Sequence, residues 1–161
     1  MRLSTKSTYG VRAMVDLARH AGRKGAVTIA EIAEREEIST PYLEQLLNKL
    51  RRQELIKSVR GPHGGYVLAK SPRRITVGDI VRILEGDTAP VTCVAGSRGG
   101  AIRCRRSDGC ATKGVWEKLA RAIDGVLDSV SLEDLAQTGL SALASRRSRG
   151  KPRGVGKRGG S

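Results

Sequence analysis

The chain has 161 residues, the length of one domain with appendages and enough to bury a hydrophobic core. It carries 30 Lys and Arg against 16 Asp and Glu, a net charge of +14. This excess favours a polyanionic partner such as a nucleic acid, because neutralising its phosphates releases bound counterions. No apolar run reaches the roughly 18 residues that span a bilayer, and the N-terminal residues lack the apolar stretch of a secretory signal. We therefore exclude a membrane-spanning protein and expect a cytoplasmic one.

Apolar residues at helical spacing predict a first helix from about Thr5 to Ala21, which the residues 22–25 (GRKG) end. Thr28 then caps a short helix that runs to Arg35, because a threonine hydroxyl satisfies a free amide at a helix start. A turn at 36–39 leads into the next helix. This order of helix, turn and helix is typical of a helix-turn-helix.

The helix after this turn carries side chains suited to reading DNA. We predict that Ser39 or Thr40 caps it, that Pro41 takes its first position, and that Glu44 completes a capping box. One face is apolar and is expected in the core: Leu43, Leu46, Leu47 and Leu50. The opposite face presents hydrogen-bond donors for base edges and phosphates: Tyr42, Gln45, Asn48, Lys49, Arg51 and Arg52.

Two short extended runs, Leu55–Val59 and Tyr66–Ala69, flank the turn RGPHGG at 60–65 and predict a β-hairpin. A helix-turn-helix followed by a hairpin with a basic tip is a winged helix-turn-helix, which points to duplex DNA. A winged helix that only contacts proteins is the alternative. Arg60 at the glycine-flanked tip and the strong positive charge favour DNA.

The C-terminal half contains a second helical region interrupted by a loop. Thr76–Asp79 predicts a capping box that opens a helix to Leu84. Residues 86–113, here called the cysteine loop, are glycine-rich without apolar periodicity, and so long a loop predicts a site. A helix from 114 to about 130 then carries an apolar stripe, which we expect to pair with a second copy because a two-fold dimer matches a palindromic DNA site.

These elements predict a mainly α fold with a small β-hairpin wing, a winged helix-turn-helix domain followed by a long C-terminal dimerisation helix. We expect the winged helix-turn-helix domain at 1–85, the cysteine loop at 86–113, the dimerisation helix and its cap at 114–138, and a tail at 139–161. Seven Lys and Arg and no acidic residue lie between 145 and 161, half of the net charge. Its basic, glycine-rich composition predicts disorder.

Cys93, Cys104 and Cys110 are candidate metal ligands, with ten and then five residues between them. In a reducing compartment they are poor disulfide candidates, whereas thiolates are soft ligands that suit iron–sulfur clusters or zinc. Nearby arginines would lower the thiol pKa values and offset cluster charge: Arg98, Arg103, Arg105 and Arg106. The spacing lacks a C-x2-C pair and supplies three ligands where four are usual, so three unligated thiols remain the alternative.

Three stretches carry a resemblance to a known family. These are MRLSTKSTYGVRAMVDLA, YLEQLLNKLRRQELIKSVRGPHGGYVLAK, and the cysteines followed by VWEKL. Over Met1 to about Leu135 the chain resembles the IscR-like winged-helix regulators of the BadM/Rrf-two family, which include iron–sulfur, nitric-oxide and iron sensors. The resemblance implies a homodimer whose interface is the helix after the loop. It also implies an iron–sulfur cluster, 2Fe-2S or 4Fe-4S, held by Cys93, Cys104 and Cys110.

The resemblance further implies that the helix near Ser39 enters the major groove and that the wing enters the minor groove. DNA contacts carried over by position are Ser39, Thr40, Pro41, Tyr42, Glu44, Gln45, Arg60 and Gly61. Glu44 matches a residue that tunes site choice. The fourth cluster ligand stays unassigned. Lys113 stands where some members have a ligating histidine, and Thr8 where others have a carboxylate. Asp108 or another residue, a small molecule, or an open site are the alternatives.

We therefore predict a DNA-binding transcriptional repressor, not an enzyme, whose promoter binding is controlled by a cluster that senses iron–sulfur status, redox stress or nitric oxide. Its partners are a palindromic duplex and a second copy. Alternatives are a regulator that uses zinc or thiol redox, one that acts through a bound metabolic enzyme, and a basic RNA-binding protein. No nucleophile–base constellation or P-loop is visible, and scarce aromatics argue against a single-strand stacking platform.

Overall fold

The computed structural model describes residues 3–94 and 109–138. Its elements are α1 (Thr5–Lys24), α2 (Ile29–Glu36), α3 (Thr40–Arg52), β1 (Ile56–Val59), β2 (Gly65–Leu68), the 3-10 helix η1 (Pro72–Arg74), α4 (Val77–Glu85) and α5 (Lys113–Ser129). Residues 132–138 are also helical. This mainly helical chain with one antiparallel hairpin confirms the predicted fold class. In the described part, no helix is long and apolar enough to cross a membrane.

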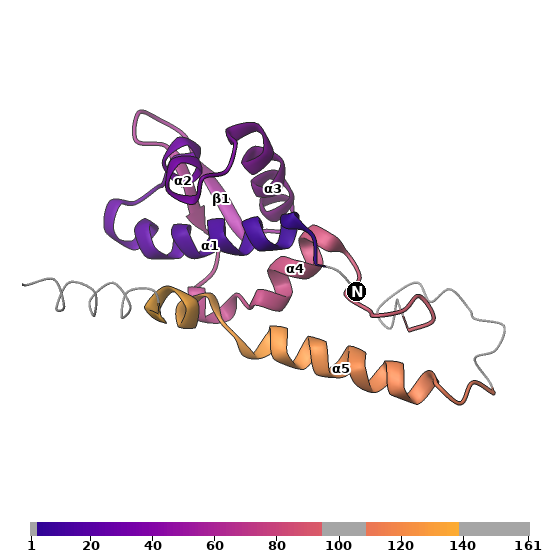
Figure 1. Ribbon diagram of the computed structural model, residues 1–161. Coiled ribbons are helices and arrows are strands. Elements are labelled where there is room, and N and C mark those ends of the chain that lie inside the picture. Colours follow the sequence, from indigo (N-terminus) through magenta and orange to yellow (C-terminus); the bar gives the residue numbers. More distant parts are fainter. Residues whose placement is uncertain (1–2, 95–108, 139–161) are drawn as a thin grey trace, which may run out of the picture.

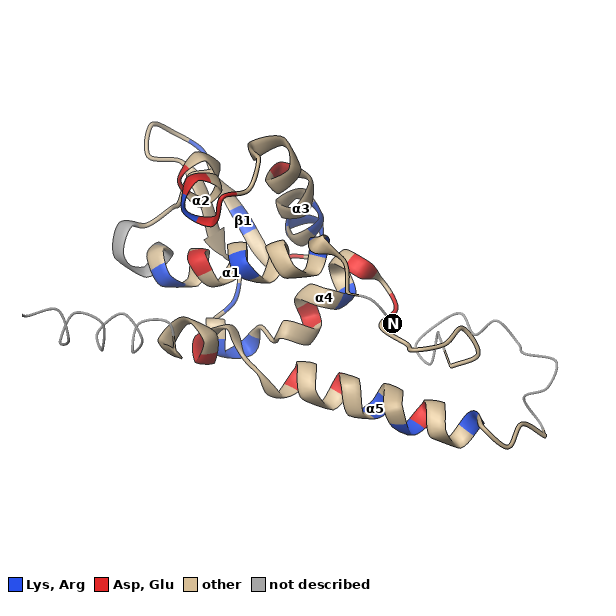
Figure 2. Cartoon of the chain, viewed as in Figure 1, with Lys and Arg blue, Asp and Glu red and all other residues tan. Residues whose placement is uncertain are grey.

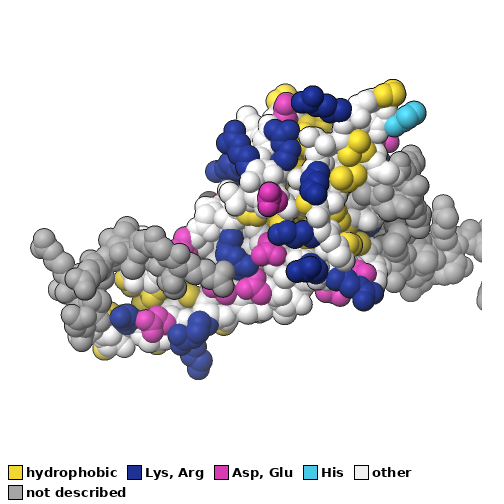
Figure 3. All heavy atoms as spheres, turned by 180° about the vertical axis from the view of Figure 1, so that it is seen from behind, with side chains coloured by type: hydrophobic (Ala, Val, Ile, Leu, Met, Phe, Trp, Pro, Cys, Tyr) yellow, Lys and Arg dark blue, Asp and Glu magenta, His cyan; other side chains and the backbone are white. Residues whose placement is uncertain are grey.

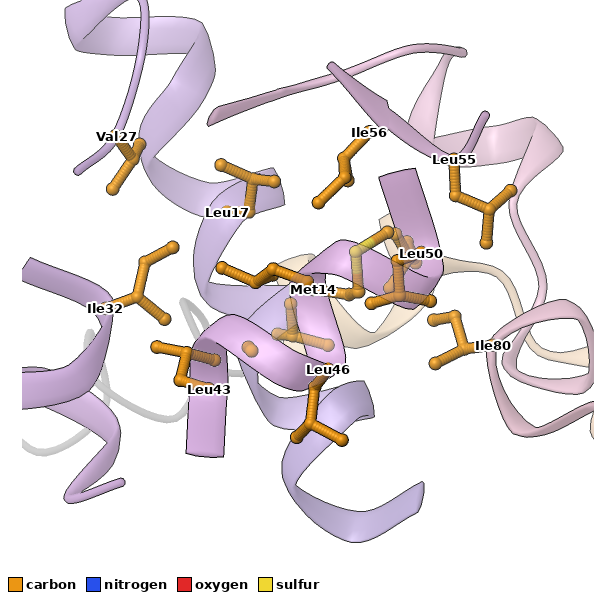
Figure 4. Close-up of a cluster of buried hydrophobic side chains, with 14 of the residues drawn as sticks. Met14, Leu17, Val27, Ile32, Leu43, Leu46, Leu50, Leu55, Ile56 and Ile80 are labelled. Atoms are coloured by element: carbon orange, nitrogen blue, oxygen red, sulfur yellow. The ribbon is translucent and has the colours of Figure 1, made fainter. Parts of the chain in front are cut away.

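Helix α1 lies at the centre of the fold. In Figure 1, α2, α3 and the hairpin lie on one side of α1, α4 lies on the other side, and α5 runs along α4. The core between these helices is drawn in Figure 4: Met14 and Leu17 of α1, Ile32 of α2, Leu43, Leu46 and Leu50 of α3, Ile56 of β1 and Ile80 of α4. Burying each such side chain stabilises the fold by about 1.5–3 kcal/mol.

The predicted caps hold for α2 and α4 and fail for α3. Capping boxes join Thr28 to Glu31 and Thr76 to Asp79, and Ser131 to Asp134 through the same pattern of hydrogen bonds. At α3 the N-cap is Ser39, whose side chain makes no capping hydrogen bond, and Thr40 rather than Pro41 is the first helical residue. The capping box predicted for Glu44 is therefore wrong, because Glu44 lies in the second turn, beyond reach of the N-cap amide.

The wing is fastened to the connection between α1 and α2. Ile56 lies opposite Leu68 in the hairpin, and Val27 adds a further backbone pair with Tyr66, with N···O distances of 3.0 and 2.7 Å. Gly65 permits this approach, since a Cβ atom there would lie 2.3 Å from the Val27 carbonyl oxygen. The tip of the wing thus extends from an anchored base.

Helix α5 is held against α4 by charge. Arg82 Nη2 lies 2.5 Å from Asp128 Oδ1, and Nη1 lies 3.7 Å from Asp124 Oδ1. The hydrogen bond to Asp128 raises the pKa of Arg82 above its usual value. Beyond α5, Leu132 N donates to Ile75 O at 2.9 Å, and the Leu132 side chain is fully buried. These contacts hold the C-terminal half of α5 and the residues after it against α4 and the 75–77 segment.

Candidate nucleic-acid interface

The N-terminal half of α3 presents polar side chains to solvent. Because the four leucines of α3 are buried, the other face is left free for a groove. Together with the wing tip, these exposed residues form what we call the DNA-reading surface: Ser39, Thr40, Pro41, Glu44, Gln45, Arg60 and Gly61. The structure places all seven at the surface, on two elements that both pack against α1. Their predicted contacts with DNA stay a prediction.

The wing tip is a tight turn. Gly61 has a φ of +118°, in a region that favours glycine, and its carbonyl accepts a hydrogen bond from Gly64 N at 2.9 Å. Arg60 and His63 are exposed beside it. A fixed backbone with an exposed guanidinium suits insertion into a minor groove, where arginine is attracted by the negative potential.

Basic side chains continue beyond the tip. Figure 2 shows basic positions at the C-terminal end of α3 and on the wing, and in Figure 3 Lys and Arg side chains run down the opposite face of the molecule among fewer acidic ones. Lys49, Arg51 and Arg52 are exposed, and none belongs to a salt bridge within the described residues. They are available to neutralise phosphates, which positions a protein on duplex DNA without reading its sequence.

Tyr42 differs from its neighbours on α3. It is half-buried, its ring meets the Tyr9 ring edge to face at a centroid distance of 6.0 Å, and its hydroxyl lies 3.3 Å from Thr5 Oγ1. The sequence placed Tyr42 on the exposed face, but the N-terminal turns of α1 pass beside it. Tyr42 thus joins the first turn of α3 to α1.

The cysteine loop is described only at its ends. Cys93 and Cys110 are half-buried and free of disulfides, while Cys104 lies outside the described residues, as do Asp108 and the four loop arginines. Cys110 Sγ lies 3.3 Å from Thr112 Oγ1, and residues 109–112 line an open pocket. Among the residues described, no group of three or more His, Cys, Asp or Glu could hold a metal ion. The three-cysteine ligand set therefore stays a prediction.

Neither of the two positions considered for a fourth ligand offers a donor suited to iron. Lys113 begins α5, and its ammonium lies 3.9 Å from Glu117 Oε1. Thr8 is exposed on α1. An ammonium has no lone pair to give a metal, so the ion pair of Lys113 argues against ligation there.

Helix α5 exposes the apolar stripe that the sequence predicted. No residue of α5 is buried within the single chain, and Val115 and Val126 are 62% and 66% exposed. Leu3 and the middle of α5 line an apolar groove: Leu3, Ala122, Ile123, Val126 and Leu127. A contiguous apolar surface of this kind marks an interaction site in soluble proteins.

Sequence reasoning missed a cluster at the end of α4. The Oε1 atom of Glu85 accepts hydrogen bonds from Ser4 N at 3.0 Å, from Ser7 Oγ at 2.7 Å, and from Ser4 Oγ. The partners are about 80 residues apart in sequence, so no local sequence pattern predicts the contact.

Comparison with known proteins decides the family. Residues 3–138 match the Rrf2 family, described as iron-dependent transcriptional regulators. This chain belongs to the Rrf2 family. Among solved structures, IscR from T. potens is 43% identical, with a TM-score of 0.67 and coverage of 96% of this chain and 94% of that one. CymR, the global cysteine regulator of B. subtilis, is 38% identical, with a TM-score of 0.68 and coverage of 86% and 98%.

The curated relatives agree with the structures. IscR of Photorhabdus laumondii is 42% identical over 135 residues, 84% of this chain and 79% of the relative. This Rrf2 protein is thus a DNA-binding transcriptional regulator, and its relatives are regulators rather than enzymes. The resemblance seen in the sequence is confirmed. The relatives divide, however, between IscR proteins and a cysteine regulator, so the family alone leaves two kinds of signal open.

Proposed function

We propose that this Rrf2 protein is a homodimeric repressor that acts in the cytoplasm and binds a palindromic operator, with α3 in the major groove and the wing in the minor groove. The observation that carries the proposal is the DNA-reading surface: seven exposed residues on the N-terminal half of α3 and on an anchored wing tip. The affinity of the dimer for an operator then depends on the distance between its two DNA-reading surfaces.

Each element of this surface has a distinct role. The Gln45 amide is suited to a bidentate contact with an adenine edge, and the Glu44 carboxylate accepts from a cytosine amino group. The hydroxyls of Ser39 and Thr40 can donate to phosphate oxygens. Pro41 and half-buried Tyr42 shape the start of the helix. In the wing, Gly61 lets the backbone turn closely so that Arg60 reaches the minor groove.

The apolar stripe of α5 supports the dimer. Val115, Leu119 and Val126 are each more than 40% exposed in the single chain. Covering them with the same helix of a second copy removes apolar surface from water, which stabilises the complex by about 25 cal/mol per Å². The interface is isologous, so one two-fold axis relates both the stripes and the operator half-sites.

We further propose that Cys93, Cys104 and Cys110 hold an iron–sulfur cluster as resident cofactor. When bound, it supplies a centre that reacts with oxidants or nitric oxide or follows iron supply. The two described thiols fit this role, since neither forms a disulfide, both are half-buried, and thiolates are soft ligands. The fourth ligand stays unassigned, with Asp108, a small molecule or an open site as candidates.

The chain itself then links the thiols to the operator. Cys93 follows α4 by eight residues and Cys110 precedes α5 by three. Holding their sulfurs together shortens and stiffens the cysteine loop, and this fixes α5 relative to α4. Because α5 pairs with its copy, the spacing of the two α3 helices follows. Releasing the sulfurs relaxes that spacing and changes operator affinity.

An anaerobic absorption spectrum with iron and sulfide analysis tests the cluster. Wild-type protein is expected to show visible cluster absorbance with matching iron and sulfide, and alanine at Cys93, Cys104 or Cys110 to remove it. Thr92→Ala, beside Cys93 and exposed, is the matched control and should keep the chromophore. Colourless wild-type protein without iron after anaerobic reconstitution would rule the cluster out.

A second candidate is a regulator that uses thiol chemistry or zinc, with or without a bound metabolic enzyme. The similarity to the cysteine regulator CymR, and two described thiols that form no disulfide, favour it over the remaining alternatives. The same preparation separates the candidates. Zinc without sulfide indicates a zinc site. Metal-free protein whose operator affinity changes on thiol oxidation indicates a redox switch.

A further inference from the structure

Glu85 is the last residue of α4, and its carboxylate accepts hydrogen bonds from the N-terminus of α1. Three donors from Ser4 and Ser7 converge on one oxygen, Oε1. Ser7 is 2% exposed, so its hydroxyl depends on Glu85 rather than on bulk solvent as its acceptor. Led by the Ser4 side-chain hydrogen bond, these contacts lower the pKa of Glu85 below its usual value. The carboxylate is thus a charged acceptor that holds Ser4 and the first turn of α1.

The position of Glu85 along the chain places it at the entrance to the cysteine loop. The next residue, Gly86, is the C-cap of α4, has a φ of +89° and donates from its backbone N to Arg82 O at 3.0 Å. Glu85 is therefore the last helical residue before the loop, and its hydrogen bonds connect this end of α4 to Ser4 and Ser7.

The same turn of α1 also contacts the DNA-reading helix. Thr5, between the two serines, has its hydroxyl oxygen 3.3 Å from the Tyr42 hydroxyl, and Tyr9 on the next turn meets the Tyr42 ring edge to face. Tyr42 lies in the first turn of α3, between Pro41 and Leu43. Glu85 and Tyr42 thus hold opposite sides of one short segment of α1.

The α1–α4 contact leaves little room to absorb a shift. A Cβ atom on Gly10 would lie 2.0 Å from Leu84 Cδ1, so the two helices meet at van der Waals distance beside Glu85. Leu84 itself is 3% exposed. Packed interiors transmit small displacements because they contain few voids. A displacement of the end of α4 would therefore press on α1 at this contact.

We infer that Glu85 is a positioning residue that couples the state of the cysteine loop to the first turn of α3, through Ser4, Ser7 and Tyr42. The inference rests on the proposed function, because it requires that loop state alters operator binding. A purely structural staple between α1 and α4 would change stability alone. A coupling group changes how strongly operator affinity responds to the loop.

The test is the ratio of operator dissociation constants before and after anaerobic incubation of the full chain with ferrous iron and sulfide. A labelled palindromic duplex, selected from a random library, is titrated by fluorescence anisotropy. In wild-type protein the two dissociation constants should differ on the order of tenfold. In Glu85→Ala their ratio should fall towards one while both forms still bind. Glu85→Gln retains Oε1 as an acceptor and should keep most of the ratio.

Matched variants make the outcome decisive. Ser4→Ala attacks the same contact from α1 and should reduce the ratio even if Glu85→Ala fails to fold. Glu133→Ala loses a surface ion pair with Arg73, 2.6 Å long and far from the loop in sequence, and should leave the ratio unchanged. A wild-type ratio retained in folded Glu85→Ala and Ser4→Ala overturns the coupling but leaves the proposed function intact. A wild-type ratio of one contradicts both.

Discussion

Gln45 and Arg60 stand for the two kinds of contact that the DNA-reading surface offers. Gln45 is an exposed amide on a helix whose other face is buried, and Arg60 is an exposed cation on a turn fixed by Gly61 and Gly64. An amide reads hydrogen-bonding pattern, whereas a cation responds mainly to charge and groove width. The two should therefore fail in different ways when they are truncated.

We predict that Gln45→Ala weakens binding to the selected operator by about 1–3 kcal/mol and relaxes preference at one base position in each half-site. Arg60→Ala should weaken binding to all duplexes and reduce the slope of affinity against salt concentration. Anisotropy titrations over a salt series measure both. Gln137→Ala, in the segment after α5, is the control. Equal losses on operator and random duplex for Gln45→Ala would contradict base reading.

Glu85 also makes stability depend on pH. Its pKa is lowered from an ordinary value of 4.5, so its contribution is present above that value and is lost as the pH falls through the folded-state pKa. Between about pH 6 and pH 3, wild-type protein should therefore lose more thermal stability than Glu85→Gln. Glu34→Gln, on the exposed side of α2, should follow the wild type. Parallel melting curves for wild type and Glu85→Gln would contradict this role.

Residues with local partners could be predicted from the sequence, and residues with distant partners could not. Thr28 and Thr76 find their capping carboxylates three residues away, as the pattern indicated. Asp16, 3% exposed, takes both arms of Arg35 at 2.8 Å, and the hydrogen bond raises the pKa of that arginine. That pairing, like the one between Glu85 and Ser4, depends on how helices pack, and no spacing in the sequence encodes it.

At the scale of elements, α5 is a helix whose apolar face is exposed in the single chain. It contacts α4 through acidic side chains on one side, with Arg82 as their partner, while the apolar side stays exposed among the described residues. Apolar periodicity predicted this helix to within a residue at each end. For α3 one of the two predicted N-caps, Ser39, is the N-cap, and the first helical residue is therefore Thr40 rather than the predicted Pro41.

We predict that Val126→Asp converts a dimer to a monomer and weakens operator binding, because a carboxylate would be buried against apolar groups in the interface. Analytical ultracentrifugation at fixed protein concentration measures the change. Arg121→Asp, which also places a carboxylate on α5 but at an exposed position outside the groove, should leave the dimer in place. A wild-type monomer, or a Val126→Asp dimer as stable as wild type, would remove α5 from the interface.

For the whole molecule, the arrangement places a loop between the part that reads DNA and the part that pairs. The anchored wing, α3 and α4 all pack against or beside α1. Arg82 on α4 binds α5 through an ion pair with Asp128, and in sequence the cysteine loop connects α4 to α5. The sequence predicted this order from motif spacing. It could not predict the contacts across α1 and α4 that would carry a change in the loop to α3.

The central claim is that the three sulfurs set operator affinity, and one measurement tests it most directly. Wild-type protein and the Cys93→Ala, Cys104→Ala, Cys110→Ala triple variant are prepared anaerobically, verified as dimers, and titrated with the same labelled palindromic duplex. The account predicts dissociation constants that differ on the order of tenfold. Equal dissociation constants in two folded dimers would contradict it.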